Sequence, residues 1–478
     1  MVNVSFLQEL LNTVAEQGRQ LLPWVGKSGD TAKDIAELAK ALVSIRGEAS
    51  GVAMARQILT LYRGLSDEQK HAFFRFLANE LQPRPEVVQD AASAYLAEPS
   101  PAALSRLQAA VESPRQEFFR RLNLAPGATG EIVALRRDLL RMLARDPSLR
   151  VVDADLRHLL YSWFNRGFLV LRRIDWQTPA AILEKIIAYE AVHEIKGWDD
   201  LRRRLDPEDR RCFAFFHPSL VDEPLIFVEV ALTDDIADNI SKLLEEEPKS
   251  GSTSEPTTAI FYSISNCQEG LKGISFGNFL IKQVVEELAR EKPTLKTFVT
   301  LSPVPSFARW LATELEQDET GLIGPDIREA LSSLADHTWL DHEEQVRALE
   351  GPLTMLAAHY LVNAKGKDGR PLDPVARFHL GNGARLERIN WLADTSPKGL
   401  RESHGIMVNY RYDLKEFERN HEAYANEGVV ATSRAVRNLL RSSVKVRPRT
   451  EPRQLPPPDK AQEEEIREPD EIIEPAGR

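Results

Sequence analysis

The stretch Tyr262–Ser302 reads YSISNCQEGLKGISFGNFLIKQVVEELAREKPTLKTFVTLS, and it decides how the second part of the chain folds. The apolar run 259–264 predicts a strand, and a loop containing three glycines follows at 268–277. Apolar residues then recur at helical spacing over 279–290, and the β-branched run 297–301 predicts a second strand. A strand, a loop, a helix and a strand in this order indicate a layered α/β architecture.

The glycine loop is a candidate phosphate-binding element. A loop that runs into a helix N-terminus leaves backbone N–H groups free, and the helix dipole favours an anion there. The spacing matches neither GxGxxG nor GxxxxGK[ST], so an ordinary glycine turn is an open alternative. The predicted substrate-binding residues of this loop are Lys272, Gly273, Ile274, Ser275, Phe276, Gly277 and Asn278.

Residues 1–150 predict a helical bundle. Apolar residues recur at helical spacing, for example over Leu7–Val14, and Phe73 and Phe118 belong to aromatic pairs that would fill the core. Helix starts are marked by Ser66 and Ser113, each with a glutamine three residues later, and by the Ser100-Pro101 pair. We expect this region to pack or oligomerise, and we find no chemistry in it.

Residues 151–443 mix strands with helices, and residues 444–478 form a separate tail. Further strands are predicted at 168–171, 212–216 and 225–232. The tail combines Pro456-Pro457-Pro458 with Glu463-Glu464-Glu465, a composition that cannot bury a core. The predicted fold class is therefore α+β, with an all-α bundle, a mixed α/β domain and a disordered acidic tail.

Composition narrows the class of protein. The net charge of −11 and the pI of about 5.6 argue against a nucleic-acid partner. No apolar run is long enough to span a membrane, and the N-terminus lacks a signal-peptide pattern. Two cysteines, Cys212 and Cys267, cannot build a disulfide framework and fit a reducing compartment. We therefore expect a cytoplasmic protein without a membrane or nucleic-acid partner.

Three residue types outside the loop could carry chemistry. Ser302 follows a strand and precedes Pro303, where the chain must leave the sheet, although a serine there is often only a cap. His379 is followed closely by Gly381 and Gly383 and could exchange a proton near neutral pH. His217 is a second histidine candidate, and Tyr412 could donate from its phenol or belong to the core. We find no convincing metal-ligand spacing, so no metal site is predicted.

Several long blocks in fixed order make the chain resemble the malonyl-CoA decarboxylase family over roughly residues 150–440. The blocks are 216–233, 259–277, 298–305, 379–384, 388–394 and 409–412. The family's serine motif often ends in glycine, where this chain has Ser306, and a loop position often held by glutamate is Ser275.

The resemblance implies a catalytic domain of the GNAT fold and an N-terminal helical bundle used in oligomerisation, giving a homo-oligomer (dimer or tetramer). It implies malonyl-CoA as substrate and acetyl-CoA as product, and no cofactor, because the thioester accepts the electrons. It assigns CoA binding to residues 272–278 and catalytic roles to Ser302, His379 and Tyr412. Two alternatives stay open, since fold does not dictate function: a CoA-dependent acyltransferase, and a non-catalytic CoA-binding scaffold.

Overall fold

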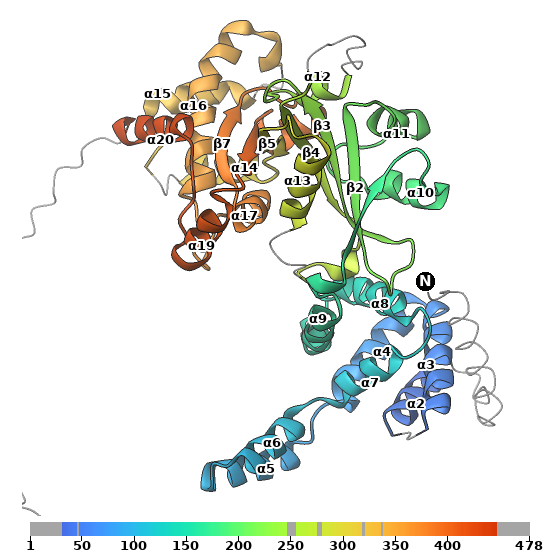
Figure 1. The fold of residues 1–478 in the computed structure, drawn as a ribbon. Coiled ribbons are helices and arrows are strands. Elements are labelled where there is room, and N and C mark those ends of the chain that lie inside the picture. Colours follow the sequence, from blue (N-terminus) through green and yellow to red (C-terminus); the bar gives the residue numbers. More distant parts are fainter. Residues whose placement is uncertain are drawn as a thin grey trace, which may run out of the picture.

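The computed structural model describes residues 31–44, 47–245, 255–274, 280–317, 321–335 and 338–446 (Figure 1). The helix expected over Leu7–Val14 and residues 447–478 of the expected tail lie outside this part. Its last helix, α20 (Arg434–Val446), extends beyond residue 444, where the tail was expected to begin.

The first part of the chain is helical, as predicted. Phe73, Phe74, Phe118 and Phe119 are buried in its core, with Phe118 and Phe119 in edge contact at 5.2 Å between ring centroids. The helices are α2 (Thr31–Ser44), α3 (Glu48–Arg63), α4 (Asp67–Glu80), α5 (Pro85–Ala97), α6 (Pro101–Val111), α7 (Pro114–Leu122), α8 (Ala128–Met142) and α9 (Arg150–Trp163).

Two of the three predicted helix caps are confirmed. Ser66 and Gln69 form a reciprocal capping box at the start of α4, and Ser100 caps α6 with its side chain. The prediction for Ser113 is wrong, because its hydroxyl donates to Asp155 at 2.6 Å and makes no cap bond. A carboxylate from another helix has displaced the local partner.

The second part contains one mixed sheet in the order β1-β2-β3-β4-β5-β8-β6, with β7 also paired to β8. Its strands are β1 (Val170–Ile174), β2 (Arg210–Phe216), β3 (Pro224–Thr233), β4 (Thr258–Asn266), β5 (Thr297–Thr300), β6 (Ser302–Pro303), β7 (Arg385–Asn390) and β8 (Met407–Arg411). The first strand lies two to three residues later than predicted, because a 3-10 turn occupies 166–168.

The predicted strand–loop–helix–strand unit is confirmed. β4 and β5 are paired in parallel, whereas the other paired strands in the described residues are antiparallel. A parallel pair needs a crossover connection, and α13 (Leu280–Glu291) supplies it. The structure therefore has the expected fold class: a helical part followed by a mixed α/β domain.

Helices cover both faces of the sheet. Alternate residues of β2 separate into two cores: Ala214 packs with the apolar sides of α10 and α11, and Phe215 belongs to the core that includes α13. The remaining helices are α10 (Ala180–Tyr189), α11 (Trp198–Leu205), α12 (Ile240–Glu245), α14 (Phe307–Gln317), α15 (Pro325–Ser332), α16 (Glu343–Val362), α17 (Pro374–Gly381), α18 (Pro397–Ser403) and α19 (Phe417–Glu427).

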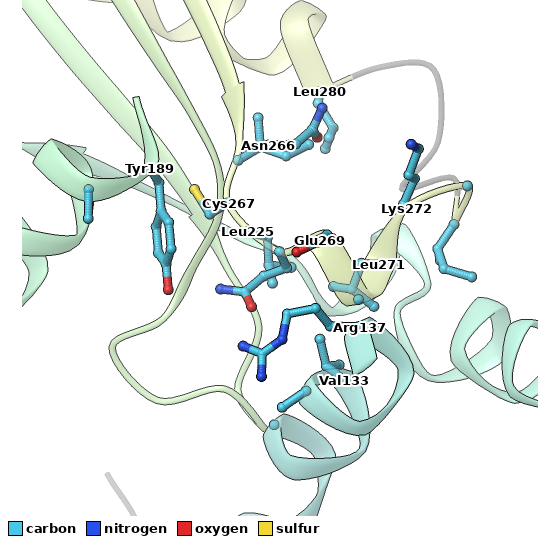
Figure 2. Close-up of a pocket in the computed structure, with 18 of the residues that line it drawn as sticks. Val133, Arg137, Tyr189, Leu225, Asn266, Cys267, Glu269, Leu271, Lys272 and Leu280 are labelled. Atoms are coloured by element: carbon cyan, nitrogen blue, oxygen red, sulfur yellow. The ribbon is translucent and has the colours of Figure 1, made fainter. Parts of the chain in front are cut away.

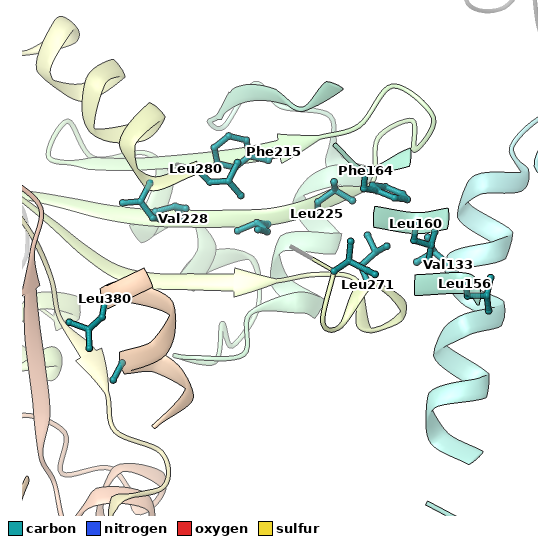
Figure 3. Close-up of a cluster of buried hydrophobic side chains, with 14 of the residues drawn as sticks. Val133, Leu156, Leu160, Phe164, Phe215, Leu225, Val228, Leu271, Leu280 and Leu380 are labelled. Carbon is teal, nitrogen blue, oxygen red and sulfur yellow. The ribbon is translucent and has the colours of Figure 1, made fainter. Parts of the chain in front are cut away.

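One hydrophobic core continues from the helical part into the sheet domain. Val133 of α8 and Leu271 of the loop after β4 belong to the same buried cluster, which reaches Leu380 of α17 (Figure 3). Leu380 lies at the far end of this cluster from Val133 in Figure 3. The helical part is thus packed directly against the predicted phosphate loop.

Across the residues that the structure describes, none of the helices combines the length and apolar character needed to cross a membrane.

Candidate active site

Strand pairing brings Ser302 and Tyr412 to the same region of the sheet. β6 pairs with β8 so that Ser302 lies opposite Val408, and β5 pairs with β8 through Val299 and Arg411. Tyr412 follows directly, and its N–H donates to the carbonyl of Phe298 at 2.8 Å. Residues separated by more than a hundred positions therefore become neighbours.

His379 is positioned by the last turn of α17. Asp373 caps this helix, accepting a hydrogen bond from the N–H of Ala376 at 2.8 Å, and Pro374 occupies its first turn. His379 is 3% exposed and is held against the sheet, where its ring stacks on Tyr410 at 4.6 Å between centroids. A capped helix and an aromatic floor together fix the orientation of the imidazole.

The three predicted catalytic residues form a continuous chain of hydrogen bonds. Nε2 of His379 lies 3.1 Å from Oγ of Ser302, and Nδ1 lies 2.7 Å from the hydroxyl oxygen of Tyr412. A neutral imidazole has one donor and one acceptor nitrogen, so it can bridge two hydroxyls. This arrangement can pass a proton between Ser302 and Tyr412.

Thr300 extends the chain, and the sequence interpretation missed it. The hydroxyl of Ser302 donates to Oγ1 of Thr300 at 2.8 Å, and the N–H of Tyr410 donates to the same atom at 3.1 Å. Thr300 is fully buried. The sequence could have indicated Thr300, because residues two apart in an extended segment face the same side and Thr300 lies two residues before Ser302.

Burial governs the protonation of this site. Desolvation lowers the pKa of His379 to about 3, so the imidazole is neutral at physiological pH. Burial likewise raises the pKa of the phenols of Tyr410 and Tyr412 well above their usual value. Each group is therefore held in its uncharged form, available as a hydrogen-bond donor or acceptor.

A cavity of about 800 Å³ lies beside this site (Figure 2). Its lining includes Leu225 and Asn266 of the sheet, Leu280 at the start of α13, and Phe378 and Asn382 on either side of His379 in sequence. Ser302, His379 and Tyr412 are not among its lining residues, but Phe378 and Asn382 bring the cavity to the segment that contains His379. The cavity is large enough for a cofactor-sized ligand.

The predicted loop forms part of the cavity wall. Lys272, Gly273 and Ile274 line it, and Gly273 has a φ of +77°, which favours glycine. The other predicted loop residues, Ser275, Phe276, Gly277 and Asn278, lie outside the described residues.

His217 is not brought to the cavity. Its ring packs against Phe164 at 4.8 Å, and Nδ1 accepts a hydrogen bond from the N–H of Ser219 at 3.1 Å. Its predicted contact with substrate gains no support from this position.

Within the described ranges, no cluster of three histidine, cysteine, aspartate or glutamate side chains could hold a metal ion.

Comparison with known proteins finds matches to both parts of the chain. A family model described as the malonyl-CoA decarboxylase C-terminal domain matches residues 167–450, and one described as the N-terminal domain matches 81–164. Malonyl-CoA decarboxylase, mitochondrial, of Anser anser anser is 41% identical over 353 residues, which are 69% of this chain and 70% of that one. The protein of the same name from Mus musculus is 40% identical over 359 residues, covering 70% and 73%.

Solved structures agree with the sequence comparisons. Malonyl-CoA decarboxylase from Rhodopseudomonas palustris is 54% identical, with a TM-score of 0.83 over 85% of this chain and 99% of that one. The Agrobacterium vitis protein is 52% identical, with a TM-score of 0.81 over the same shares. A helical part joined to a mixed α/β sheet domain defines the class of protein. Within that class, the chain belongs to the malonyl-CoA decarboxylase family.

Proposed function

We propose that this protein is an enzyme that decarboxylates malonyl-CoA to acetyl-CoA and carbon dioxide. Membership of the family supports the reaction. The assignment of the catalytic residues rests on one observation, the hydrogen bonds of His379 to both Ser302 and Tyr412. The adjoining cavity ends at α17, on the residues that flank His379. A thioester bound along this cavity would place its acyl end next to the histidine.

The chemistry needs an electron sink and a proton. Cleavage of the bond between the carboxylate carbon and the α carbon releases carbon dioxide and leaves the electron pair on the thioester as an enolate. A proton then adds to the α carbon and gives acetyl-CoA. Donors placed at a developing oxyanion contribute about 3–4 kcal/mol each. We assign that role to Ser302 and His379, with Tyr412 holding the far side of the imidazole.

Neutral His379 suits this role. A cationic imidazole would pair with the substrate carboxylate and stabilise the ground state, whereas a neutral donor favours charge that develops on the thioester oxygen. The proton for the α carbon can then be relayed through the hydroxyls of Ser302 and Tyr412, which solvent scarcely reaches. Water is excluded from the enolate by the same burial.

The reaction is tested with purified full-length protein and carboxyl-labelled malonyl-CoA, without added amine. Release of label matched by acetyl-CoA, and reduced about 10²–10⁴-fold in His379→Asn, supports the enzyme and its site. The release of label by Ser302→Ala should also be reduced in the same assay. Release of free CoA only when an amine is added would instead favour the acyltransferase. CoA binding without turnover would favour the scaffold.

We also propose that the helical part mediates a homo-oligomer, either a dimer or a tetramer. Helices α5 and α6 form a hairpin that projects from the body (Figure 1) and contains no buried residue. Leu96 is 79% exposed and Leu104 40% exposed, so this hairpin offers apolar side chains that a second copy of the chain could cover. Light scattering should report a multiple of the chain mass, and Leu96→Glu with Leu104→Glu should reduce it.

The division into a bundle (1–150), a catalytic domain (151–443) and a tail (444–478) stays a prediction, as does a cytoplasmic location. Cys212 and Cys267 are both free thiols, which suits a reducing compartment. The relatives from Anser anser anser and Mus musculus are named mitochondrial. Fractionation of cells that express the tagged full chain would decide the location.

A further inference from the structure

The helical part contributes basic side chains to the cavity wall. Gly130, Val133, Ala134, Arg137 and Arg141 of α8 line it together with the loop after β4. Figure 2 shows the guanidinium of Arg137 reaching from α8 beneath the turn formed by residues 269–271. A region expected to pack or oligomerise therefore also contributes to the wall of the candidate ligand cavity.

The position of α8 is fixed by direct contacts with the loop. Arg136, 1% exposed, donates to the carbonyls of Gly270 at 2.7 Å and Lys272 at 3.0 Å and pairs with Asp153. A Cβ on Gly270 would lie 1.9 Å from the carbonyl oxygen of Val133, so helix and loop are in backbone contact. The arginines of α8 are thus held at a defined distance from the loop.

The charge at this end of the cavity is positive. Arg141 pairs with Glu269 at 2.6 Å, and Asp138 is shared between Lys70 at 2.8 Å and Arg137 at 3.1 Å. Lys272 adds a further ammonium on the other side of the turn in Figure 2. The cations therefore outnumber the carboxylates here.

Arg137 is the cation best placed to bind a ligand. Its Nε and Nη2 donate to Asp138, and Nη1 has no hydrogen-bond partner within the part of the chain that the structure describes. Its side chain is 43% exposed where it faces the cavity. A guanidinium with a free edge is suited to a phosphate group.

CoA carries two separate phosphate groups: a pyrophosphate and a 3′-phosphate on the ribose. Lys272, which lines the cavity on one side of the turn at 269–271, supplies a cation for the pyrophosphate. Arg137 lies on the opposite side of the turn, and Val133 of the same helix is remote from α17 in Figure 3. Arg137 is thus available for the 3′-phosphate, at the end of the cavity away from the thioester.

We propose that Arg137, supplied by the helical part, binds the 3′-phosphate of CoA, so that the enzyme distinguishes CoA thioesters from their 3′-dephospho analogues. This inference rests on the proposed function for the identity of the ligand. It makes the helical part a contributor to substrate recognition as well as a candidate for oligomerisation.

The test compares CoA with 3′-dephospho-CoA by calorimetry on the full chain, and malonyl-CoA with its dephospho analogue by KM. The wild type should prefer the phosphorylated ligand by about tenfold, the value of one charge-assisted hydrogen bond. Arg137→Gln should abolish this preference by weakening CoA alone, and Arg137→Lys should retain part of it. Arg145→Gln removes an exposed arginine that does not line the cavity and should keep the full preference.

The proposal is overturned by a wild type that binds both ligands equally, or by an Arg137→Gln variant that still prefers CoA. A loss of the preference in Arg145→Gln as well would also overturn it, because the effect would then be one of overall charge. The wild type's release of labelled carbon dioxide is measured separately. Failure of that release with the phosphate preference intact would reject the decarboxylase and leave Arg137 as a CoA contact.

Discussion

The hydroxyl of Tyr412 lies 2.7 Å from Nδ1 of His379, on the side of the ring opposite Ser302. The Tyr412 ring packs against Phe261 and Phe417, so its place in the core does not depend on the hydroxyl. Tyr412→Phe should therefore fold normally and lose only the contact with the imidazole. We expect turnover to fall about tenfold, the value of one hydrogen bond of roughly 1.4 kcal/mol, with KM little changed.

Steady-state kinetics and a thermal melt check this prediction. An unchanged turnover number in Tyr412→Phe would assign Tyr412 to the core alone. A rise in KM with constant turnover would instead place its hydroxyl against bound substrate.

Thr300 should control the orientation of the Ser302 hydroxyl. Thr300→Val keeps the shape of the side chain but removes the acceptor of that hydroxyl and of the Tyr410 N–H. The buried N–H then lacks a partner, which costs about 1–3 kcal/mol of stability. The Ser302 proton is left with only His379 as a nearby acceptor, and we expect turnover to fall about tenfold.

Thr300→Ser is the matched control, because it retains the hydroxyl while removing one methyl group. It should restore most of the turnover that Thr300→Val loses, although a small cavity lowers its melting temperature. Equal turnover in the two variants would show that packing, and not the hydroxyl, is what the site needs from Thr300.

Thr300 also shows which site residues could be predicted from the sequence and which could not. Ser302, His379 and Tyr412 were recognised through family resemblance, and the structure brings them into contact, although their catalytic roles stay predictions. Thr300 could have been found by strand alternation from Ser302. The bond from Arg136 to Gly270 joins residues 134 positions apart, and no local pattern encodes such a contact.

The same limit applies to the fold. The β4–α13–β5 unit was predicted because glycines and helical periodicity mark its boundaries locally. Ser113 was assigned a cap that it does not make, because Asp155 offers it a tertiary partner. Local propensity thus predicted the elements, whereas the contacts between distant elements decided which polar groups are shared.

The pH dependence of activity should lack a histidine break near pH 6.5. Burial lowers the pKa of His379 to about 3, below the usual value of about 6.5, so the imidazole is neutral between pH 5 and 9. We expect kcat/KM for malonyl-CoA to show no loss of activity on deprotonation near pH 6.5. A tenfold fall per pH unit above about 6.5 would mean that a cationic His379 is the active form.

Stability provides an independent measurement of the same pKa. Between about pH 3 and 6.5 the unfolded chain binds a proton on His379 that the folded chain does not, so this residue's contribution is lost as pH falls through that window. The free energy of unfolding, measured by chemical denaturation, should fall more in the wild type than in His379→Asn as the pH is lowered through this range. Parallel curves for the two proteins would show that the folded histidine titrates normally.

The contact between the two parts of the chain should depend on Gly270. A Cβ there would lie 1.9 Å from the carbonyl oxygen of Val133, so Gly270→Ala must separate α8 from the turn at 269–271. The shift would weaken the hydrogen bonds from Arg136 and move the loop that lines the cavity. We expect a loss of roughly 1–3 kcal/mol in the free energy of unfolding and a higher KM for malonyl-CoA.

Gly351→Ala is the control, since Gly351 lies within α16 and a Cβ there meets no atom within 4 Å. Pro352 follows directly and disfavours the α conformation for a residue with a Cβ. We therefore expect no gain in stability, a change of less than about 1 kcal/mol in the free energy of unfolding, and the wild-type KM. Calorimetric melts and steady-state kinetics on both variants decide the matter. If Gly270→Ala matched Gly351→Ala in melting temperature and KM, the close packing of α8 on the loop would not matter for substrate binding. Oligomerisation would then be the one role left to propose for the helical part.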